Sequence, residues 1–152
     1  MDITKPIRFK GKFGELTVDS LIDTGASISM IPLDLARQIG AWKTNDEMQI
    51  VGVNNQVSLL PLGAVIVKFP MFNDIGGKLV VPVSDKETRP IIGMDIMNPL
   101  GIIIDTKTKT LSLRNPDNEN LKNILAGIGT ATLFVGGTIL VVKILEEIFK
   151  KK

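Results

Sequence analysis

Near its beginning the chain reads Ser20-Leu-Ile-Asp23-Thr24-Gly25-Ala26-Ser27-Ile28-Ser29. Apolar residues lead into an aspartate, which is followed at once by threonine and glycine. This order predicts a strand that ends by delivering a carboxylate into a tight turn, where N–H groups and hydroxyls can position it. A lone Asp-Thr-Gly is a weak signal, so its meaning depends on the sequence around it.

Short apolar segments broken by turn residues surround this stretch and predict a mainly β domain. Two short helices interrupt the strands. One follows Pro32 and ends at Gly40, and the other begins near Met94 and should stop before Pro99, because the residue before proline disfavours helix. The predicted strands are Ile7–Lys12, Leu16–Ile22, Glu47–Val53, Gln56–Leu60, Gly63–Phe69, Lys78–Val83, Ile102–Asp105 and Thr110–Leu113.

The composition excludes several kinds of chemistry. The 152 residues include no histidine and no cysteine, which rules out zinc sites built from those ligands and Ser-His-Asp or Cys-His catalysis. Residues 1–120 hold 13 Lys and Arg against 14 Asp and Glu, and this near-neutral body argues against nucleic acid as a partner. We expect no metal and no cofactor, so carboxylates, hydroxyls and backbone groups must carry any chemistry.

The segment around Asp23 resembles the active-site loop of retropepsin-like aspartic peptidases, in which two hydrophobic residues precede Asp-Thr/Ser-Gly-Ala/Ser. Further along, Ile91-Ile92-Gly93 resembles the family's second signature, and Ile50–Val57 resembles its flap hairpin. The end of the domain, Ile103–Leu113, is similar to the closing hairpin of cellular and bacterial relatives. The resemblance covers most of residues 7–113 and implies a closed acid-protease barrel with a flap.

The resemblance also implies roles for individual residues. Asp23 is the catalytic aspartate, Thr24 links two active-site loops through its hydroxyl, and Gly25 forms the turn and contacts substrate. Ala26 completes the loop, where many relatives carry serine. The flap comprises Gly52, Val53, Asn54 and Asn55, and the support behind the loop comprises Ile91, Ile92 and Gly93.

Aspartic peptidases use two carboxylates that share one proton around a water molecule. This chain has one Asp-Thr-Gly, and the similar Asp105-Thr106-Lys107 lacks the glycine, so Asp105 is interpreted as a hairpin residue. We therefore expect a homodimer in which each subunit supplies one Asp23. The expected substrate is a peptide or protein, bound as an extended and mostly hydrophobic segment.

Other interpretations remain open at this level. Thr24 and Gly25 would also suit a plain surface turn, and Asn54-Asn55 an ordinary hairpin. Asp95 would either cap the following helix or join a salt bridge at a dimer interface. For the whole chain, the alternatives are a catalytically inactive dimeric binding module of the same fold and a small membrane protein with a structural head.

Beyond residue 114 the composition changes. We predict a peptidase domain over residues 1–114, a linker over 115–120 and a C-terminal helix over 121–152. Its core, Ile124–Val142, holds 19 residues without a charge, enough to cross a membrane as a helix, although a buried helix is the alternative. Charge does not decide orientation, and synthesis order alone favours a single-pass anchor with the peptidase domain facing the cytoplasm.

Overall fold

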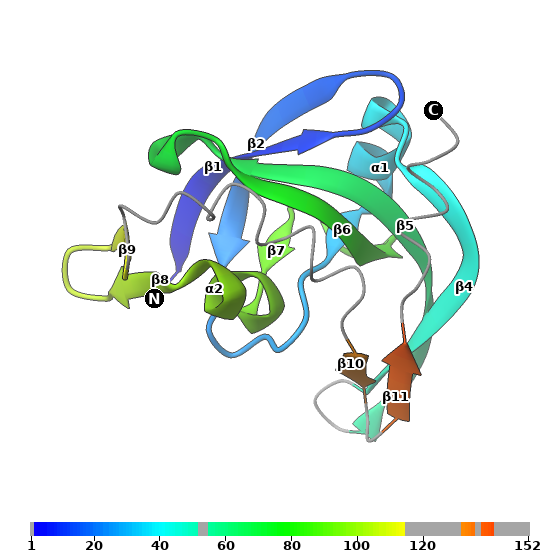
Figure 1. Ribbon diagram of the computed structural model, residues 1–152. Helices are drawn as coiled ribbons and strands as arrows, with labels where there is room; N and C mark the ends of the chain where they lie inside the picture. Colours follow the sequence, from blue (N-terminus) through cyan, green and yellow to red (C-terminus); the bar gives the residue numbers. More distant parts are fainter. Residues whose placement is uncertain (1, 52–54, 115–131, 136–137, 142–152) are drawn as a thin grey trace.

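The structure is a computed structural model that describes residues 2–51, 55–114, 132–135 and 138–141. Seven strands form the main sheet in the order β3-β6-β5-β1-β2-β7, with β4 paired to β5 (Figure 1). The predicted mainly β architecture with short helices is confirmed. The sheet strands are β1 (Ile3–Lys10), β2 (Glu15–Ile22), β3 (Ile31–Pro32), β4 (Trp42–Val51), β5 (Val57–Phe69), β6 (Ile75–Ser84) and β7 (Ile91–Ile92).

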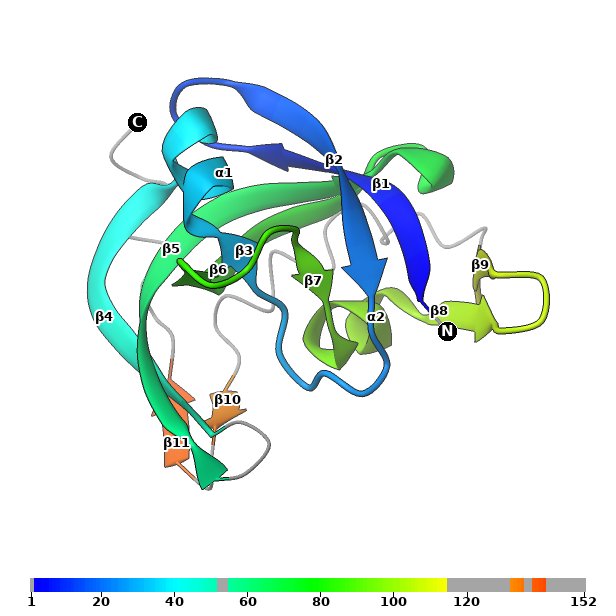
Figure 2. The ribbon, with the colours of Figure 1, turned by 180° about the vertical axis from the view of Figure 1, so that it is seen from behind.

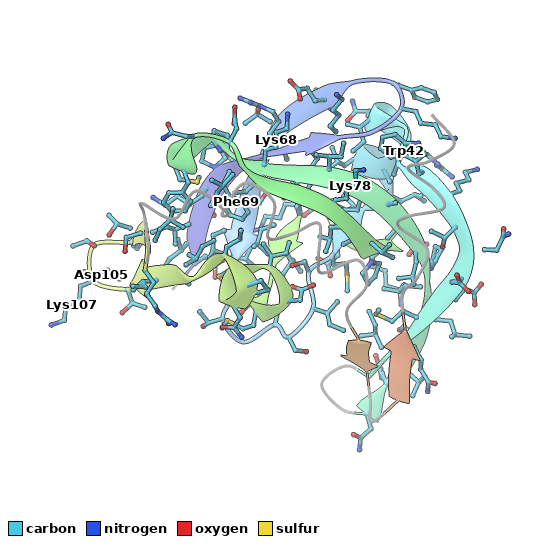
Figure 3. All side chains as sticks on the ribbon, viewed as in Figure 1. Trp42, Lys68, Phe69, Lys78, Asp105 and Lys107 are labelled. Atoms are coloured by element: carbon cyan, nitrogen blue, oxygen red, sulfur yellow. The ribbon has the colours of Figure 1, made fainter. Side chains whose placement is uncertain are left out.

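Helix α1 (Leu33–Ile39) is where the sequence predicts it. Pro32 precedes the first turn, and Gly40 ends the helix in the left-handed region at φ 69°, which glycine adopts without steric cost. Leu35 and Ile39 are buried in the main core beside residues of β1, β5 and β6. Phe69, at the end of β5, is fully buried in the same core (Figure 3).

Strand β5 is one continuous strand, whereas two separate strands, Gln56–Leu60 and Gly63–Phe69, were predicted. The proline between them, Pro61, pairs with Glu47 of β4 next to an irregularity in the register, and a proline is tolerated at such a break. β4 and β5 extend together as a hairpin away from the body of the molecule (Figure 1). A short 3-10 turn, η2 (Pro70–Phe72), then leads to β6.

Helix α2 (Met94–Leu100) runs two residues further than predicted and includes Pro99. The prediction that it stops before Pro99 is therefore wrong. Proline in the last turn of a short helix removes only its own bond to the fourth residue back, and this loss is offset by burial of Ile96, Met97 and Leu100. Gly101, at φ 67°, then ends the helix.

The closing hairpin, β8 (Ile102–Asp105) and β9 (Thr110–Leu113), has the predicted bounds and forms a separate two-stranded sheet. Beyond it, the described residues form the antiparallel pair β10 (Thr132–Val135) and β11 (Thr138–Val141), and β10 lies beside β4 (Figures 1 and 2). A continuous helix was predicted here. Hydropathy and length favoured the helix, but these residues are rich in Thr, Val, Ile and Phe, which favour strands.

The rest of the predicted linker and C-terminal helix lies outside the described residues. In the part of the chain that the structure describes, no helix has the length and apolar character needed to span a membrane.

The loop that joins β2 to β3, residues 23–30, is held at both ends by β7. Ile91 and Ile92 pair in parallel with Leu21 and Ile22 of β2. On its other side, Ile91 exchanges two backbone hydrogen bonds with Met30, at 2.8 and 2.9 Å. The loop therefore leaves and re-enters the structure on either side of one short strand (Figure 2).

Gly93, between β7 and α2, lets the backbones meet closely behind this loop. A Cβ atom at Gly93 would lie 2.7 Å from the carbonyl oxygen of Ala26 and 3.0 Å from the carbonyl carbon of Ile28. The adjacent N–H of Met94 donates a hydrogen bond to the Ala26 carbonyl at 2.9 Å. Any side chain at residue 93 would push the loop away from α2.

A buried polar group fixes the same contact. The hydroxyl of Ser29, a residue only 1% exposed, donates to Asp95 Oδ1 at 2.6 Å and accepts from the N–H of Gly93 at 2.8 Å. The backbone N–H of Ser29 also donates to the Asp95 carboxylate, at 3.0 Å to each oxygen. Of the two interpretations left open for Asp95, neither covers this contact, which joins α2 to the loop.

Burial raises the pKa of Asp95 above its ordinary value of 3.8, and the hydrogen bonds from Ser29 and Ile96 oppose that rise. A raised pKa in the folded state means that the native protein binds more protons than the unfolded chain at and above the ordinary value. The stability that Asp95 contributes is therefore complete at low pH and is lost as the pH rises through the folded-state pKa.

We predict that the free energy of unfolding of the wild type minus that of Asp95→Asn is larger at about pH 4 than at about pH 8. Denaturant unfolding at both pH values measures this difference. Asp105→Asn is the matched control, because the pKa of Asp105 is lowered and its pH dependence should have the opposite sign. A difference for Asp95→Asn that grows with pH would contradict the assignment.

Candidate functional site

Asp23 is the first residue after β2, at the point where the strand has neighbours on both sides. Ile22 is buried and pairs with Ile3 of β1 and Ile92 of β7. The N–H of Asp23 continues the ladder by donating to the Ile92 carbonyl at 2.9 Å. The backbone of Asp23 is thus fixed by the sheet, while its side chain is only half-buried.

The next residues form the tight turn that the sequence predicts. The N–H of Gly25 donates to Asp23 Oδ1 at 2.9 Å, and the N–H of Ala26 donates to the Asp23 carbonyl at 3.2 Å. Thr24 and Gly25 are exposed at the tip of the loop. Among the described residues, the Thr24 hydroxyl has no hydrogen-bond partner, so it is available to a group from outside the chain.

The structure brings part of the predicted site together. Ile91, Ile92 and Gly93 lie directly behind the turn that contains Asp23, through the contacts of β7 and Gly93 described above. Of the predicted flap, Gly52, Val53 and Asn54 lie outside the described residues. Asn55 is described and has a φ of 58°, the left-handed conformation that tight turns require and that asparagine tolerates.

Asp105 lies at the turn of the β8–β9 hairpin, as the sequence predicts (Figure 3). Its Oδ1 accepts hydrogen bonds from the N–H groups of Lys107 at 2.9 Å and Thr108 at 3.2 Å. The bonds from Thr108 and Lys107 hold the pKa of Asp105 below its ordinary value. Asp105 is a turn residue and makes no contact with Asp23.

Two further parts of the site were not predicted from the sequence. Ser29 was read only as part of the loop, yet it joins the loop to Asp95 across 66 residues of sequence. The segment Ser84–Glu87, which begins at the last residue of β6, faces the β4–β5 hairpin across a pocket of about 390 Å³. Nothing in the sequence Ser-Asp-Lys-Glu indicates that these residues line a pocket, because the pocket exists only once β6 has paired with β5.

The arrangement can present one half-buried carboxylate beside an exposed loop tip, with its orientation set by the Gly25 N–H. A pocket lies under the neighbouring hairpin. An ionised carboxylate in such a position can accept a proton from a water molecule. Within the described ranges, no group of three or more His, Cys, Asp or Glu side chains could hold a metal ion.

Solved structures with the same fold include the retroviral protease-like domain of Ddi1 from Leishmania major. It is 19% identical, with a TM-score of 0.52, over 76% of this chain and 90% of that one. The EIAV protease in complex with the inhibitor HBY-793 is 20% identical, with a TM-score of 0.47, over 66% of this chain and 89% of that one.

A retropepsin-like aspartic protease from Rickettsia conorii is 13% identical, with a TM-score of 0.37, over 70% of this chain and 89% of that one. No curated protein matches the sequence. The family described as aspartyl protease matches residues 9–96, a span that holds the Asp23 turn, both strands of the β4–β5 hairpin and Gly93. The chain belongs to the aspartyl protease family.

Proposed function

We propose that the chain is a homodimeric aspartic endopeptidase, in which two Asp23 carboxylates, one per subunit, activate a water molecule for attack on a peptide bond. The observation that carries this proposal is the placement of Asp23. Its backbone is fixed in the sheet, its Oδ1 accepts from the Gly25 N–H at 2.9 Å, and the half-buried residue lies directly beside the exposed loop tip at Thr24 and Gly25.

The need for a second subunit follows from the chain's own residues. The sequence contains one Asp-Thr-Gly, and no described carboxylate makes a hydrogen bond with Asp23. Two carboxylates about 3 Å apart cannot both ionise, so a pair holds one proton, and one member serves as base while the other polarises the substrate carbonyl. A two-fold axis at the exposed Thr24-Gly25 tip would bring the same residue from each chain together.

The residues around Asp23 take supporting roles in this proposal. The Thr24 hydroxyl, which has no partner among the described residues, bonds across the dimer axis, and Gly25 leaves room for the substrate backbone. The β4–β5 hairpin acts as the flap. Ile91, Ile92 and Gly93 support the loop from behind.

Asp23→Asn should reduce peptide cleavage by at least about 10²-fold, because an amide cannot act as a base. Cleavage of a peptide library by the purified chain, with and without pepstatin, measures this. Asp105→Asn is the matched control: it alters the chain's other Asp-Thr pair and should keep wild-type activity. Full turnover by Asp23→Asn would refute the mechanism. A wild type that dimerises but cleaves nothing would favour the alternative, an inactive binding module.

Subunit mixing tests the shared site. When wild type and Asp23→Asn are mixed in equal amounts and allowed to exchange subunits, only dimers with two wild-type chains should be active. At the same total chain concentration, the activity of the mixture should then be about one quarter of that of the wild type alone, because dimers form at random. A fall to only about one half would show that each chain works alone. Mixing with Asp105→Asn should leave the activity unchanged.

We also propose that the C-terminal segment tethers the enzyme to a membrane, with the peptidase domain in the cytoplasm. Support comes from the sequence alone: Ile124–Val142 has no charged residue and is bracketed by Lys122 and Lys143, whereas the structure describes strands β10 and β11 within this segment. Confinement to a membrane raises the effective concentration of the subunits and so favours the dimer.

Deletion of residues 121–152 should therefore release the chain from the membrane fraction and make its specific activity fall on dilution. Fractionation with carbonate extraction, and activity per mole at nanomolar and micromolar concentration, measure the two effects. Full-length protein that is soluble without detergent would refute the tether. A truncated chain with the same activity per mole at both concentrations would refute the role in dimerisation.

A further inference from the structure

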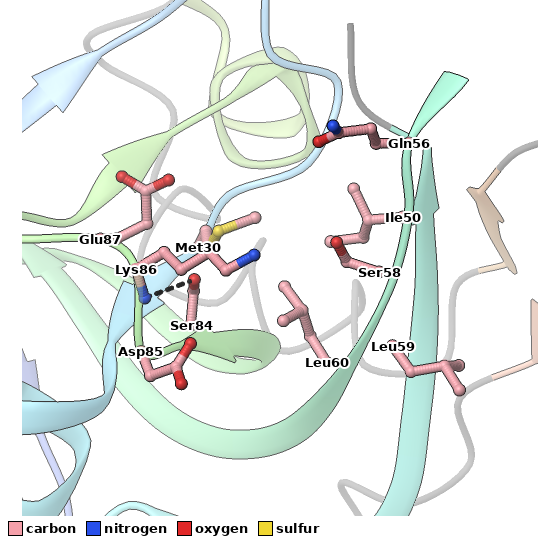
Figure 4. A pocket seen from close by; sticks show the side chains of 10 residues that line it. All are labelled: Met30, Ile50, Gln56, Ser58, Leu59, Leu60, Ser84, Asp85, Lys86 and Glu87. Carbon is pink, nitrogen blue, oxygen red and sulfur yellow. Dashed lines mark hydrogen bonds between the residues drawn. The ribbon is translucent and has the colours of Figure 1, made fainter. Parts of the chain in front are cut away.

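A pocket of about 390 Å³ lies between the β4–β5 hairpin and the segment that follows β6 (Figure 4). Met30, at the end of the loop that begins with Asp23, forms part of its lining, so the pocket adjoins the proposed catalytic loop. One wall is the hairpin face, and the opposite wall is Ser84–Glu87. A substrate held under the hairpin would have a side chain in this space.

The hairpin wall is mostly apolar. Ile50 of β4 pairs with Ser58 of β5, and Leu60 follows two residues later on the same face of the strand. All three are half-buried, whereas the alternate residue Leu59 is 65% exposed. Together with Met30, Ile50 and Leu60 offer a surface for the aliphatic part of a side chain.

The opposite wall is charged. The backbone N–H of Lys86 donates to the Oγ of the buried Ser84 at 3.2 Å, which fixes the turn at the end of β6. From this turn the Lys86 side chain extends across the pocket, with its ammonium group directed towards Ile50 and Ser58 (Figure 4). In the described part of the chain, Lys86 makes no ion pair.

Two carboxylates, Asp85 and Glu87, flank Lys86 in the sequence and also line the pocket, but neither forms an ion pair with it in the described residues. Figure 4 shows the Glu87 carboxylate directed away from the ammonium group, and the Asp85 carboxylate at the far edge of the Ser84 turn. No ion pair within 4.0 Å joins either of them to Lys86 in the described residues. The ammonium is thus the charged group that reaches furthest into the pocket.

We propose that this pocket is a substrate subsite in which Lys86 selects an acidic side chain, with glutamate as the best fit. The methylene groups of glutamate would lie on Ile50 and Leu60, and its carboxylate would reach the Lys86 ammonium. The inference rests on the proposed peptidase function. For this one position it replaces the hydrophobic side chain that the expected, mostly hydrophobic substrate segment would place there.

The two-fold symmetry of the proposed homodimer determines at which substrate positions glutamate should be preferred. A homodimer has two copies of the pocket, related by the two-fold axis through the Asp23 pair. The preference for glutamate should therefore occur at two positions, one on each side of the cleaved bond and equally distant from it. One substitution, Lys86→Met, should remove both preferences together.

The experiment compares kcat/KM for peptides that carry Glu, Gln, Leu or Lys at each position around the cleaved bond. For the wild type, Glu should exceed the isosteric Gln by about two- to fivefold, as an exposed ion pair allows, and added salt should reduce the ratio. Lys86→Met keeps the length of the side chain without its charge and should bring the ratio to about one. Lys86→Glu should favour Lys over Gln. Lys12→Met, in the β1–β2 turn, is the matched control and should keep the wild-type ratio.

A Glu-to-Gln ratio that survives in Lys86→Met would overturn the proposal. A wild-type preference for Lys would also overturn it, and would assign the pocket to Asp85 and Glu87. If a folded, dimeric wild type cleaves no peptide of the library, the peptidase function itself fails and the inference fails with it. Cleavage without any Glu preference removes the inference alone.

Discussion

The two-residue strand β7 is the constraint on which the site depends. It pairs in parallel with β2 just before Asp23, and it exchanges hydrogen bonds with Met30 where the loop ends. Both ends of the loop are therefore fixed by Ile91 and Ile92, and only the tip around Thr24 is exposed. A loop of this kind can hold a carboxylate in one orientation without burying it, because its rigidity comes from its ends.

The second support for the loop is buried and polar. Ser29 and Asp95 join the loop to the first turn of α2, and Gly93 lets the two backbones approach to a distance that excludes a side chain. A buried carboxylate is costly unless donors surround it, and here the Ser29 hydroxyl and two backbone N–H groups, from Ser29 and Ile96, fill that role. Among the described residues, no buried side-chain nitrogen or oxygen lacks a hydrogen-bond partner. The arrangement therefore holds the loop in one position against α2.

The sequence predicted features that depend on local patterns and missed those that depend on tertiary contacts. The β8–β9 hairpin and α1 were found because turn residues and caps mark their ends. Two features were missed because tertiary contacts override the local effect of proline. Pairing with β4 joins the two predicted strands into β5, and burial of Leu100 continues α2 through Pro99. β1 begins at Ile3, before Pro6, because at Pro6 it pairs only with β2 and the other edge needs no N–H donor.

The same division holds for the site. The Asp23 turn could be predicted because its residues are contiguous and each has a stereochemical reason for its place. The Ser29–Asp95 contact and the pocket wall formed by Ser84–Glu87 could not be predicted, because their partners come from distant segments that only the complete sheet brings together. A glycine such as Gly93 is suggestive in sequence, but its purpose depends on which carbonyl groups face it.

Strand β5 has a mechanical consequence. Its last residue, Phe69, is fully buried in the core, and its first residues form the projecting hairpin. The strand is therefore held by the core at one end and projects from it at the other. The register break between Lys43 and Glu47, next to Pro61, interrupts the pairing of β4 with β5. Bending there would tilt the hairpin as a rigid unit, and the half held by the core, from Gly63 to Phe69, would set its stiffness. Core residues that never touch a ligand would thus determine how readily the hairpin opens.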